Sequence, residues 1–330
     1  MEDSVCAVVL AYNRKKFLIE SLEALRMQSR PLQGIYLIDN VSTDGTPELL
    51  WEKGYIYELP PLNINEPWER EFIITNLTNG EPIKFHYVRM HRNTGTSGGF
   101  YEGMKRAFEK GYQWLWVMDD DVEPLQDCLE KLSFHFDKKV LVPLQLFEGI
   151  ISSLSSGIKV RNWTFLITRP ITEEEFIERD LVEIDIAPWG GILINREIIE
   201  QVGYPDMRFF MHYCDADFCL RVRRVTRIFL VKEAKVLHKW KTATRTINPY
   251  TNVKLWRQYY LERNKIIFRK RHIKNKLAFL TFIFADFILL GNKMIKRFLQ
   301  GYPWKEAKLL YYAFLDGITE NFERDFSEIV

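Results

Sequence analysis

The stretch Trp114-Leu115-Trp116-Val117-Met118-Asp119-Asp120-Asp121 sets five apolar residues directly before three carboxylates. An apolar run of this length predicts a buried strand over 114–118. Ligands of open α/β sheets bind outside the carboxyl ends of the strands, which is where these acids would lie. Three adjacent carboxylates repel one another, and oxygen ligands suit Mg²⁺ or Mn²⁺. The alternative is a solvated acidic turn before a helix.

Strands and helices alternate on both sides of this stretch. Apolar runs predict further strands at 5–12, 34–38, 85–90 and 140–147. Helical spacing predicts helices at 14–28, 46–52, 98–110 and from Pro124 to 136. The polar residues 60–81 interrupt the pattern as an insertion or a hairpin. Strands separated by helices predict an α/β fold with a mostly parallel central sheet flanked by helices.

The pattern changes after residue 150. Short strands and loops are predicted up to 186, then a strand at 190–194, helices at 195–202 and 215–225, and strands near 228–231 and 236–238. Three helices follow, at about 251–272, 276–299 and 303–319. We therefore divide the chain into a catalytic-type domain, 1–250, and a basic, aromatic-rich helical extension, 251–330.

Charge is distributed unevenly along the 330 residues, whose formal net charge is +2. From Lys239 onward there are 18 Lys and Arg against 8 Asp and Glu, a net of +10, so the first 238 residues carry a net of −8. Such asymmetry predicts that the basic part contacts a membrane surface or a nucleic acid.

Composition excludes several classes of protein. Hydrophobic residues make up 47% of the chain, which argues against wholesale disorder. The 4 cysteines contain no CxxC pair, so a disulfide framework or a zinc ribbon is not expected, and free thiols suit the cytosol. The chain starts with the acidic residues Glu2 and Asp3, whereas a signal peptide starts with positively charged residues, so a signal peptide is not expected.

A glycine-rich loop, Asn93-Thr94-Gly95-Thr96-Ser97-Gly98-Gly99, lies between a predicted strand and a helix. Glycine lets a backbone approach a ligand closely, and a helix N-terminus attracts phosphate. The spacing matches neither a Walker A loop nor GxGxxG, so an ordinary turn remains open. Asp39, at the end of the second strand, could accept hydrogen bonds from a ribose or a base.

A second acidic segment, Phe210-Met211-His212-Tyr213-Cys214-Asp215-Ala216-Asp217, opens a predicted helix. Asp215 and Asp217 could serve as a base and an orienting acid, or could cap the helix. We expect Asp217 to be the cap. His238 could complete a metal site, although a lone histidine at a strand end is more often structural.

In combination and order, these stretches resemble family 2 glycosyltransferases of the GT-A fold. The matching segments are 9–14, 38–46, 119–121, 189–191 and 215–217. Segments 92–100, 118–121, 210–221 and 259–264, with His238, are most similar to the galactofuranosyl- and rhamnosyl-transferase branch. The resemblance covers roughly residues 5–270, and Cys214 departs from members of the branch that carry an acid there.

The resemblance implies an enzyme that transfers a sugar with inversion, from a nucleotide-sugar donor to a hydroxyl of a glycan or lipid-linked glycan. UDP-galactofuranose is the best-matched donor, and dTDP-rhamnose or UDP-galactopyranose are alternatives. The implied donor-binding residues are Ala11, Tyr12, Arg14, Asp39, Asn93, Gly95, Gly98, Asp119 and Asp120. The implied ligands of Mn²⁺ or Mg²⁺ are Asp119, Asp121 and His238.

The resemblance also makes Asp215 the general base and places Trp189, Gly190, Gly191 and His212 on the acceptor side. Core packing is the alternative for Trp189, and an exposed loop position is the alternative for His212. A non-catalytic nucleotide-sugar-binding protein is the competing function, although such a protein would not need both Asp215 and the acid triplet.

The extension is predicted to lie on the anionic inner face of the cell membrane. Basic residues at 269–271, 274 and 276 flank aromatic residues at 279, 282, 284 and 287. The apolar run 277–291, interrupted by Asp286, is predicted to be too short to span a bilayer. A homo-oligomer interface or a helical core is weighed equally, and we expect no nucleic-acid partner despite the interleaved aromatic rings.

Overall fold

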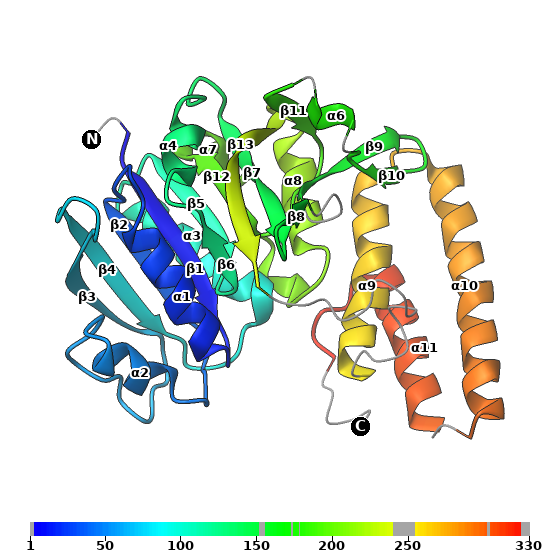
Figure 1. Ribbon diagram of the computed structural model, residues 1–330. Coiled ribbons are helices and arrows are strands. Elements are labelled where there is room, and N and C mark those ends of the chain that lie inside the picture. The colour runs from blue at the N-terminus through cyan, green and yellow to red at the C-terminus, as the bar shows by residue number, and fades with distance from the viewer. Residues whose placement is uncertain are drawn as a thin grey trace.

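The computed structural model describes residues 3–151, 156–172, 174–177, 179–239, 255–301 and 304–324. One large mixed sheet runs through the molecule (Figure 1). Its strands are, in spatial order, β11 (Leu181–Ile184), β13 (Ile228–His238), β7 (Val140–Phe147), β12 (Gly190–Asn195), β5 (Trp114–Asp119), β1 (Val5–Ala11), β2 (Gly34–Asp39), β4 (Pro82–Arg89) and β3 (Trp68–Thr75). Short β6 (Val122–Pro124) pairs with β13, and β8 (Ile150–Ile151) pairs with β7.

The centre of this sheet is parallel, as the sequence predicts. β5, β1, β2 and β4 pair in parallel, whereas β12 and β3 join on either side as antiparallel strands. Leu10 pairs with Asp119, and Ala11 pairs with Asp39. The carboxyl ends of three strands therefore meet at one edge of the sheet, where the predicted site residues are gathered.

Helices cover both faces of the sheet (Figure 1). Successive side chains of a strand point to opposite faces. In β1, Cys6 and Val8 therefore pack in the core that contains α3 (Gly95–Glu109), and Ala7 and Val9 pack in the core that contains α1 (Lys15–Arg26). Further helices among the described residues of this body are α2 (Thr46–Glu52), α4 (Cys128–Ser133), α6 (Glu174–Ile177), α7 (Arg196–Val202), η1 (Met207–Phe209) and α8 (Cys214–Val222).

Two local predictions are wrong. The helix expected from Pro124 begins only at Cys128, because residues 122–124 form β6 and pair with the end of β13. The two strands expected at 228–231 and 236–238 are one strand, β13, whose register shifts between Val231 and Lys235.

The polar segment 60–81 is expected from the sequence to be an insertion or a hairpin. It contains β3, which pairs antiparallel with the following strand β4, so its second half is the first arm and the turn of a hairpin.

The predicted helical extension is present as α9 (Leu255–His272), α10 (Lys276–Leu299) and α11 (Trp304–Thr319). Its predicted boundary at 250/251 lies outside the described residues. Tyr259 of α9 packs on Leu309 and Ala313 of α11, while α10 forms the outer edge (Figure 1). The hairpin of β9 (Ile158–Asn162) and β10 (Ile167–Pro170) lies between the sheet and these helices (Figure 1).

Candidate active site

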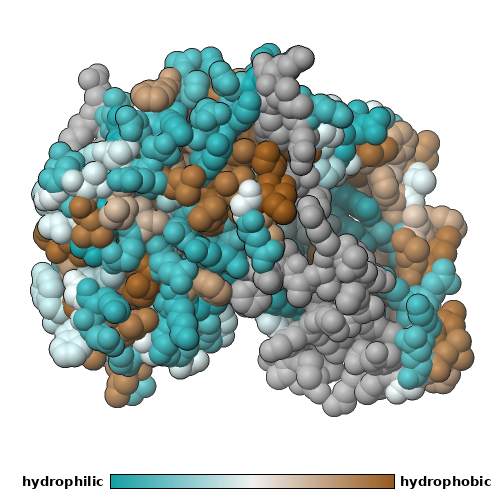
Figure 2. All heavy atoms as spheres, viewed as in Figure 1, coloured by the Kyte–Doolittle hydropathy of each residue, from teal (hydrophilic) through white to brown (hydrophobic). Residues whose placement is uncertain are grey.

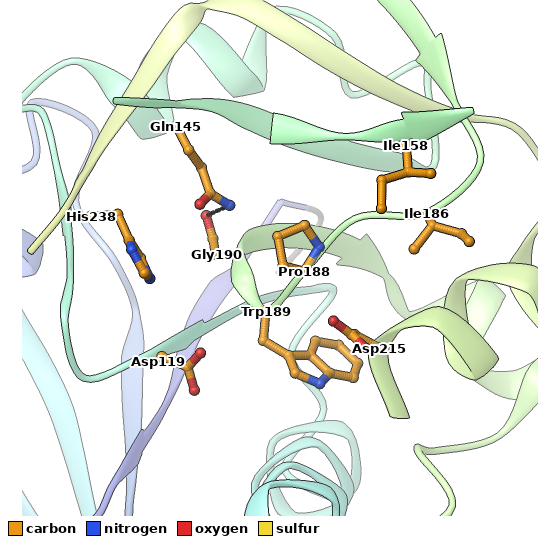
Figure 3. A pocket seen from close by; sticks show the side chains of 9 residues that line it. All are labelled: Asp119, Gln145, Ile158, Ile186, Pro188, Trp189, Gly190, Asp215 and His238. Carbon is orange, nitrogen blue, oxygen red and sulfur yellow. Dashed lines mark hydrogen bonds between the residues drawn. The ribbon is translucent and has the colours of Figure 1, made fainter. Parts of the chain in front are cut away.

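A cavity of about 260 Å³ opens at the carboxyl end of β5 (Figure 3). Its lining is Asp119, Gln145, Ile158, Ile186, Pro188, Trp189, Gly190, Asp215 and His238. Five of these were singled out from the sequence, and the fold brings them together from β5, β12, α8 and β13. Asp119 and His238 lie on one side of Pro188 and Trp189, and Asp215 lies on the other (Figure 3).

The acid triplet divides into one carboxylate that lines the cavity and two that are held by an arginine. Arg14 NH2 lies 2.5 Å from Asp120 Oδ1, and Arg14 NH1 lies 2.5 Å from Asp121 Oδ2. Burial and the charge of Asp121 raise the pKa of Asp119 well above its ordinary value. Burial also raises the pKa of Asp120 to about 7, against the opposing effect of Arg14. One guanidinium therefore does not fully compensate three acids.

The donor groups beside Asp119 fit a divalent cation chemically. Asp121 Oδ1 is buried, has no hydrogen-bond partner in the part of the chain that the structure describes, and lies 3.7 Å from Nε2 of His238. Burial lowers the pKa of His238, which favours the neutral imidazole that metals bind. Within the described parts of the chain, no three Asp, Glu, His or Cys side chains are arranged as a metal site. The fit rests on the orphaned oxygen and on the uncompensated acids.

The predicted donor-binding residues at the ends of β1 and β2 differ in accessibility. Tyr12 is 46% exposed, and its backbone amide donates to Asp120 Oδ2 at 3.2 Å. Ala11 and Asp39 are buried. The Asp39 carboxylate already accepts from the Ser42 amide, the Tyr87 hydroxyl and Arg89 NH1, at 2.8, 2.8 and 2.5 Å. Asp39 therefore lies below the surface, and its hydrogen bonds hold the end of β2 in place.

The glycine-rich loop is held by an asparagine that the sequence analysis did not single out. Asn40 is buried; its Nδ2 donates to the Asn93 side chain at 3.0 Å and to the Gly95 carbonyl at 3.1 Å. Its Oδ1 accepts from the Thr94 amide at 2.9 Å. Gly95 has φ +69°, and a Cβ there would lie 2.2 Å from the Phe210 carbonyl oxygen. At Gly98, a Cβ would lie 2.5 Å from Thr94 Cβ.

Asp215 lies in the first turn of α8 and is half-buried. Its Oδ1 accepts from the Ala216 amide at 2.8 Å. Burial raises the pKa of Asp215, with the backbone hydrogen bonds opposing this effect. A carboxylate with a raised pKa on a cavity wall can accept a proton from a hydroxyl within hydrogen-bond reach.

Asp217 is not the cap of α8, contrary to expectation. Tyr213 occupies the N-cap position without a side-chain hydrogen bond. The Asp217 carboxylate is buried, lying 3.0 Å from His272 Nε2 and accepting from Arg221 Nε at 3.1 Å. It ties α8 to α9, a partner that lies 55 residues away in the sequence.

The acceptor-side residues also separate. Trp189 is only 4% exposed and packs against Phe100 and Phe218, with ring centroids 4.9 and 5.5 Å apart, so most of its ring belongs to the core. Gly191 has φ +100°. His212 is exposed and does not line the cavity; partial desolvation and the charge of Arg257 lower its pKa.

Gln145 is the polar lining residue that sequence reasoning missed. Its side chain is 1% exposed, and Nε2 lies 3.5 Å from the Gly190 carbonyl oxygen (Figure 3). A Cβ at Gly190 would lie 1.8 Å from that nitrogen, so the glycine makes room for the amide. The available signal was its position near the carboxyl end of the predicted strand 140–147.

The amino-acid sequence matches the model of a known protein family. The model of glycosyl transferase family 2 matches residues 6–54 and 69–203, more than half of the chain. The chain belongs to glycosyl transferase family 2. The family match ends before α8 and β13, so Asp215 and His238 lie outside it.

Relatives of this family 2 member include two sugar transferases. Galactofuranosyltransferase GlfT1 of Mycolicibacterium smegmatis is 26% identical over 228 residues, or 67% of this chain and 65% of the relative. The dTDP-rhamnosyl transferase RfbF of Shigella flexneri is 23% identical over 218 residues, or 61% of this chain and 69% of the relative. The chain thus spans about two thirds of the length of these proteins.

Solved structures support the fold. GalNAc-T7, crystallised with UDP, GalNAc and Mn²⁺, superposes with a TM-score of 0.55 at 16% identity, over 86% of this chain and 57% of its own. S. aureus TarS 1-349 with UDP-GlcNAc gives 0.54 at 14% identity, over 97% and 82%. At these identities the likeness concerns the fold alone, which is the GT-A fold expected from the sequence.

Proposed function

We propose that this protein is an inverting glycosyltransferase that moves a sugar from a nucleotide-sugar donor to a hydroxyl of a glycan or a lipid-linked glycan. The observation that carries the proposal is the pair of carboxylates on one cavity, Asp119 at the end of β5 and Asp215 at the start of α8. One lies at the sheet edge where nucleotides bind, and the other has no cation paired with it among the described residues.

Asp215 takes the proton of the acceptor hydroxyl. At the same time the hydroxyl oxygen attacks the anomeric carbon of the donor, and the bond between that carbon and the leaving diphosphate breaks. The carboxylate is half-buried on the cavity wall, where an acceptor hydroxyl can reach it. Gln145 and the apolar lining confine the acceptor, and the loop held by Asn40 places the donor for in-line attack.

A divalent ion, Mn²⁺ or Mg²⁺, would be held by Asp119, Asp121 and His238 and would supply charge neutralisation at the departing diphosphate. Asp121 Oδ1, which has no hydrogen-bond partner among the described residues, supports this assignment. Arg14 fixes the neighbouring oxygens of Asp120 and Asp121 and limits the repulsion among the three acids.

We propose galactofuranose from UDP-galactofuranose as the transferred sugar. The support is the similarity to galactofuranosyltransferase GlfT1 at 26% identity. Rhamnose from dTDP-rhamnose is the second candidate, favoured by the similarity to RfbF.

A donor screen tests the function. The protein is incubated with UDP-galactofuranose, UDP-galactopyranose, UDP-GlcNAc and dTDP-rhamnose plus an acceptor pool, and the release of UDP or dTDP is measured. The expected result is release from one donor only, dependent on acceptor, with Asp215→Asn retaining UDP binding but losing transfer by orders of magnitude. Binding of donors without any transfer would support the non-catalytic alternative, and near-normal transfer by Asp215→Asn would remove Asp215 from the role of base.

We also propose that the extension rests on an anionic membrane surface on the cytoplasmic side. Brown apolar spheres follow the outer edge of the molecule where α10 lies (Figure 2). Leu277, Leu280 and Phe284 are 73, 59 and 66% exposed there. Lysines 274, 276, 296 and 308 are exposed on the same three-helix unit and complement anionic lipid headgroups.

The prediction that the apolar run is too short to span a membrane needs correction. Lys276–Lys296 is 21 residues long with a mean hydropathy of 1.6, which is long and apolar enough to cross a bilayer by length and composition. Asp286 in this helix is nevertheless buried, with Arg269 NH1 at 2.5 Å and Lys265 Nζ at 3.1 Å, both from α9. These ties hold α10 beside a helix that packs on the body, which supports surface contact rather than insertion.

A further inference from the structure

The segment that leads into α8 has an unusual backbone. Phe210, His212 and Tyr213 have φ of 63, 58 and 63°, in the left-handed region, although none is glycine. Such conformations persist only where surrounding groups hold them in place. We call residues 208–213 the base loop, because Asp215 follows two residues later and its carboxylate is placed by the path of this loop.

The base loop has a donor for each of its carbonyl groups. The Phe210 carbonyl accepts from the Ser97 amide at 3.0 Å, which joins the loop to the glycine-rich segment. The Tyr213 carbonyl accepts from the Asp217 amide at 2.8 Å, inside α8. The four other carbonyls accept from two adjacent side chains of α9, Arg263 and Asn264.

Arg263 NH2 lies 3.1 Å from the Arg208 carbonyl oxygen and 3.2 Å from that of Phe209. Asn264 Nδ2 lies 2.9, 2.6 and 3.2 Å from the carbonyl oxygens of Phe209, Met211 and His212. The two side chains also orient each other, because Arg263 Nε donates to Asn264 Oδ1 at 2.9 Å.

Both side chains are buried, with 2% of Arg263 and 0% of Asn264 exposed. In the described part of the chain no carboxylate lies within 4.0 Å of the Arg263 guanidinium, so its hydrogen bonds go to backbone carbonyls, to Asn264 and to aromatic faces. Burying a charged group is costly unless its donors are satisfied. Tyr260, one turn earlier, stacks on Phe210 with centroids 4.7 Å apart and fixes the same loop from its side-chain face.

We propose that Arg263 and Asn264 are positioning residues, which hold the base loop in its left-handed path and thereby aim Asp215 into the cavity. This inference rests on the proposed role of Asp215 as general base. It makes α9 part of the catalytic apparatus, in addition to its place in the extension.

The decisive variant is Asn264→Asp, which keeps the size of the side chain but replaces the donating amide with an oxygen that repels the loop carbonyls. We expect kcat to fall on the order of 10²-fold, as for a misplaced catalytic group. KM for the donor and the affinity for UDP should stay within about twofold, because the acids are untouched and Asn40 still holds the glycine-rich loop. Asn264→Gln and Arg263→Lys keep donors and should recover part of kcat.

Hydrogen exchange followed by mass spectrometry gives a readout that does not depend on activity. Amides 209–214 should exchange faster in Asn264→Asp, while those of the central sheet are unchanged. The matched control is Asp286→Asn, which removes a buried polar contact between α9 and α10 away from the base loop, and should change neither kcat on a soluble acceptor nor exchange at 209–214.

The proposal is overturned if Asn264→Asp keeps kcat within about threefold and normal exchange at 209–214. It is equally overturned if UDP affinity falls in parallel with kcat, as general loss of structure would produce. If Asn264→Asp does not fold, Asn264→Gln and Arg263→Lys are judged by the same criteria. If the wild-type protein transfers no sugar, the proposed function fails, and the exchange data alone still decide whether α9 holds the loop.

Discussion

Arg14 shows how a single residue can support a site through the side chains beside it. The resemblance placed it in the nucleotide pocket, and the structure shows its guanidinium bridging Asp120 and Asp121, at 2.5 Å from each. A positive charge held there lowers the cost of keeping two buried acids ionised. The resemblance assigned Arg14 to the nucleotide pocket but could not reveal its partners, which lie 106 and 107 positions later.

Removal of the metal is expected to abolish transfer. EDTA should eliminate activity and Mn²⁺ or Mg²⁺ should restore it, because the leaving diphosphate needs charge neutralisation. Asp121→Asn should weaken Mn²⁺ binding by at least about tenfold, measured from free Mn²⁺ by electron paramagnetic resonance in the presence of UDP. Asp137→Asn, at an exposed acid, is the control. Full activity after exhaustive chelation would contradict the proposed metal site.

The pH dependence of kcat should report Asp215. Its pKa is raised by burial, and only the ionised carboxylate can accept a proton. Transfer should therefore be high above the raised pKa and should fall as the pH drops through it, at a pH above the ordinary value for aspartate of about 3.9. The measurement is kcat against pH at saturating substrates. If kcat stays constant as the pH drops and falls only near pH about 4, the pKa of Asp215 is not raised.

Among the elements, the glycine-rich loop has no room for an added side-chain atom at Gly95. Gly95→Ala would place a Cβ 2.2 Å from the Phe210 carbonyl oxygen, so we expect the base loop and the glycine-rich loop to separate and transfer to fall by at least about tenfold. Steady-state kinetics and UDP titration measure the effect. The matched control is Gly54→Ala, whose φ of +74° imposes similar backbone strain but whose Cβ would meet nothing within 4 Å. Equal losses in the two variants would show that strain, rather than the contact, matters.

The elements themselves follow from local pattern, and their contacts do not. Apolar runs located the central strands of the sheet but not β3 or β6, and helical spacing located the three helices of the extension. Pro124 misled because proline is common both at the start of a helix and at the end of an edge strand. Asp217 misled because an acid in the first turn of a helix is normally explained by the helix itself.

The candidate site was found to the extent that its residues sit at the ends of predicted strands and helices, as Asp119 and Asp215 do. Asn40 and Gln145 were missed because a buried amide carries no pattern, and its role is visible only once its hydrogen-bond partners are known. The contact between α9 and the base loop joins residues more than 50 positions apart, which no local spacing encodes.

At the scale of the whole molecule, the outer face of α10 should bind anionic vesicles. Replacing Leu280 and Phe284 with glutamate should abolish cosedimentation with phosphatidylglycerol vesicles, because each exposed apolar side chain gains about 1.5–3 kcal/mol on full burial. Leu62→Glu, on a fully exposed residue of the body, is the control. A dimer that dissociates in the double variant, without vesicle binding by the wild type, would assign the face to a second copy instead.

The salt dependence of that binding should be modest. Much of the basic charge in the extension is already neutralised internally, since Glu262 pairs with Lys265 and Lys293, and Asp286 pairs with Lys265 and Arg269. In addition, Lys239 and Arg271 pair with the body acids Glu123 and Asp206, so fewer cations than the net of +10 suggests are available to lipid headgroups, each contributing about 1 kcal/mol near the surface. Vesicle binding should persist in 0.5 M NaCl, whereas complete release would mean that electrostatics dominates.

The dependence of the base loop on α9 has a consequence for the order in which the protein matures. Chains are made from the N-terminus, and domains generally fold as they emerge. The sheet, the acid triplet and Asp215 are all complete before Arg263 and Asn264 leave the ribosome. A nascent chain can therefore hold a nearly finished body while Asp215, the proposed base, is not yet in position, and on this proposal activity arrives only with the last quarter of the polypeptide.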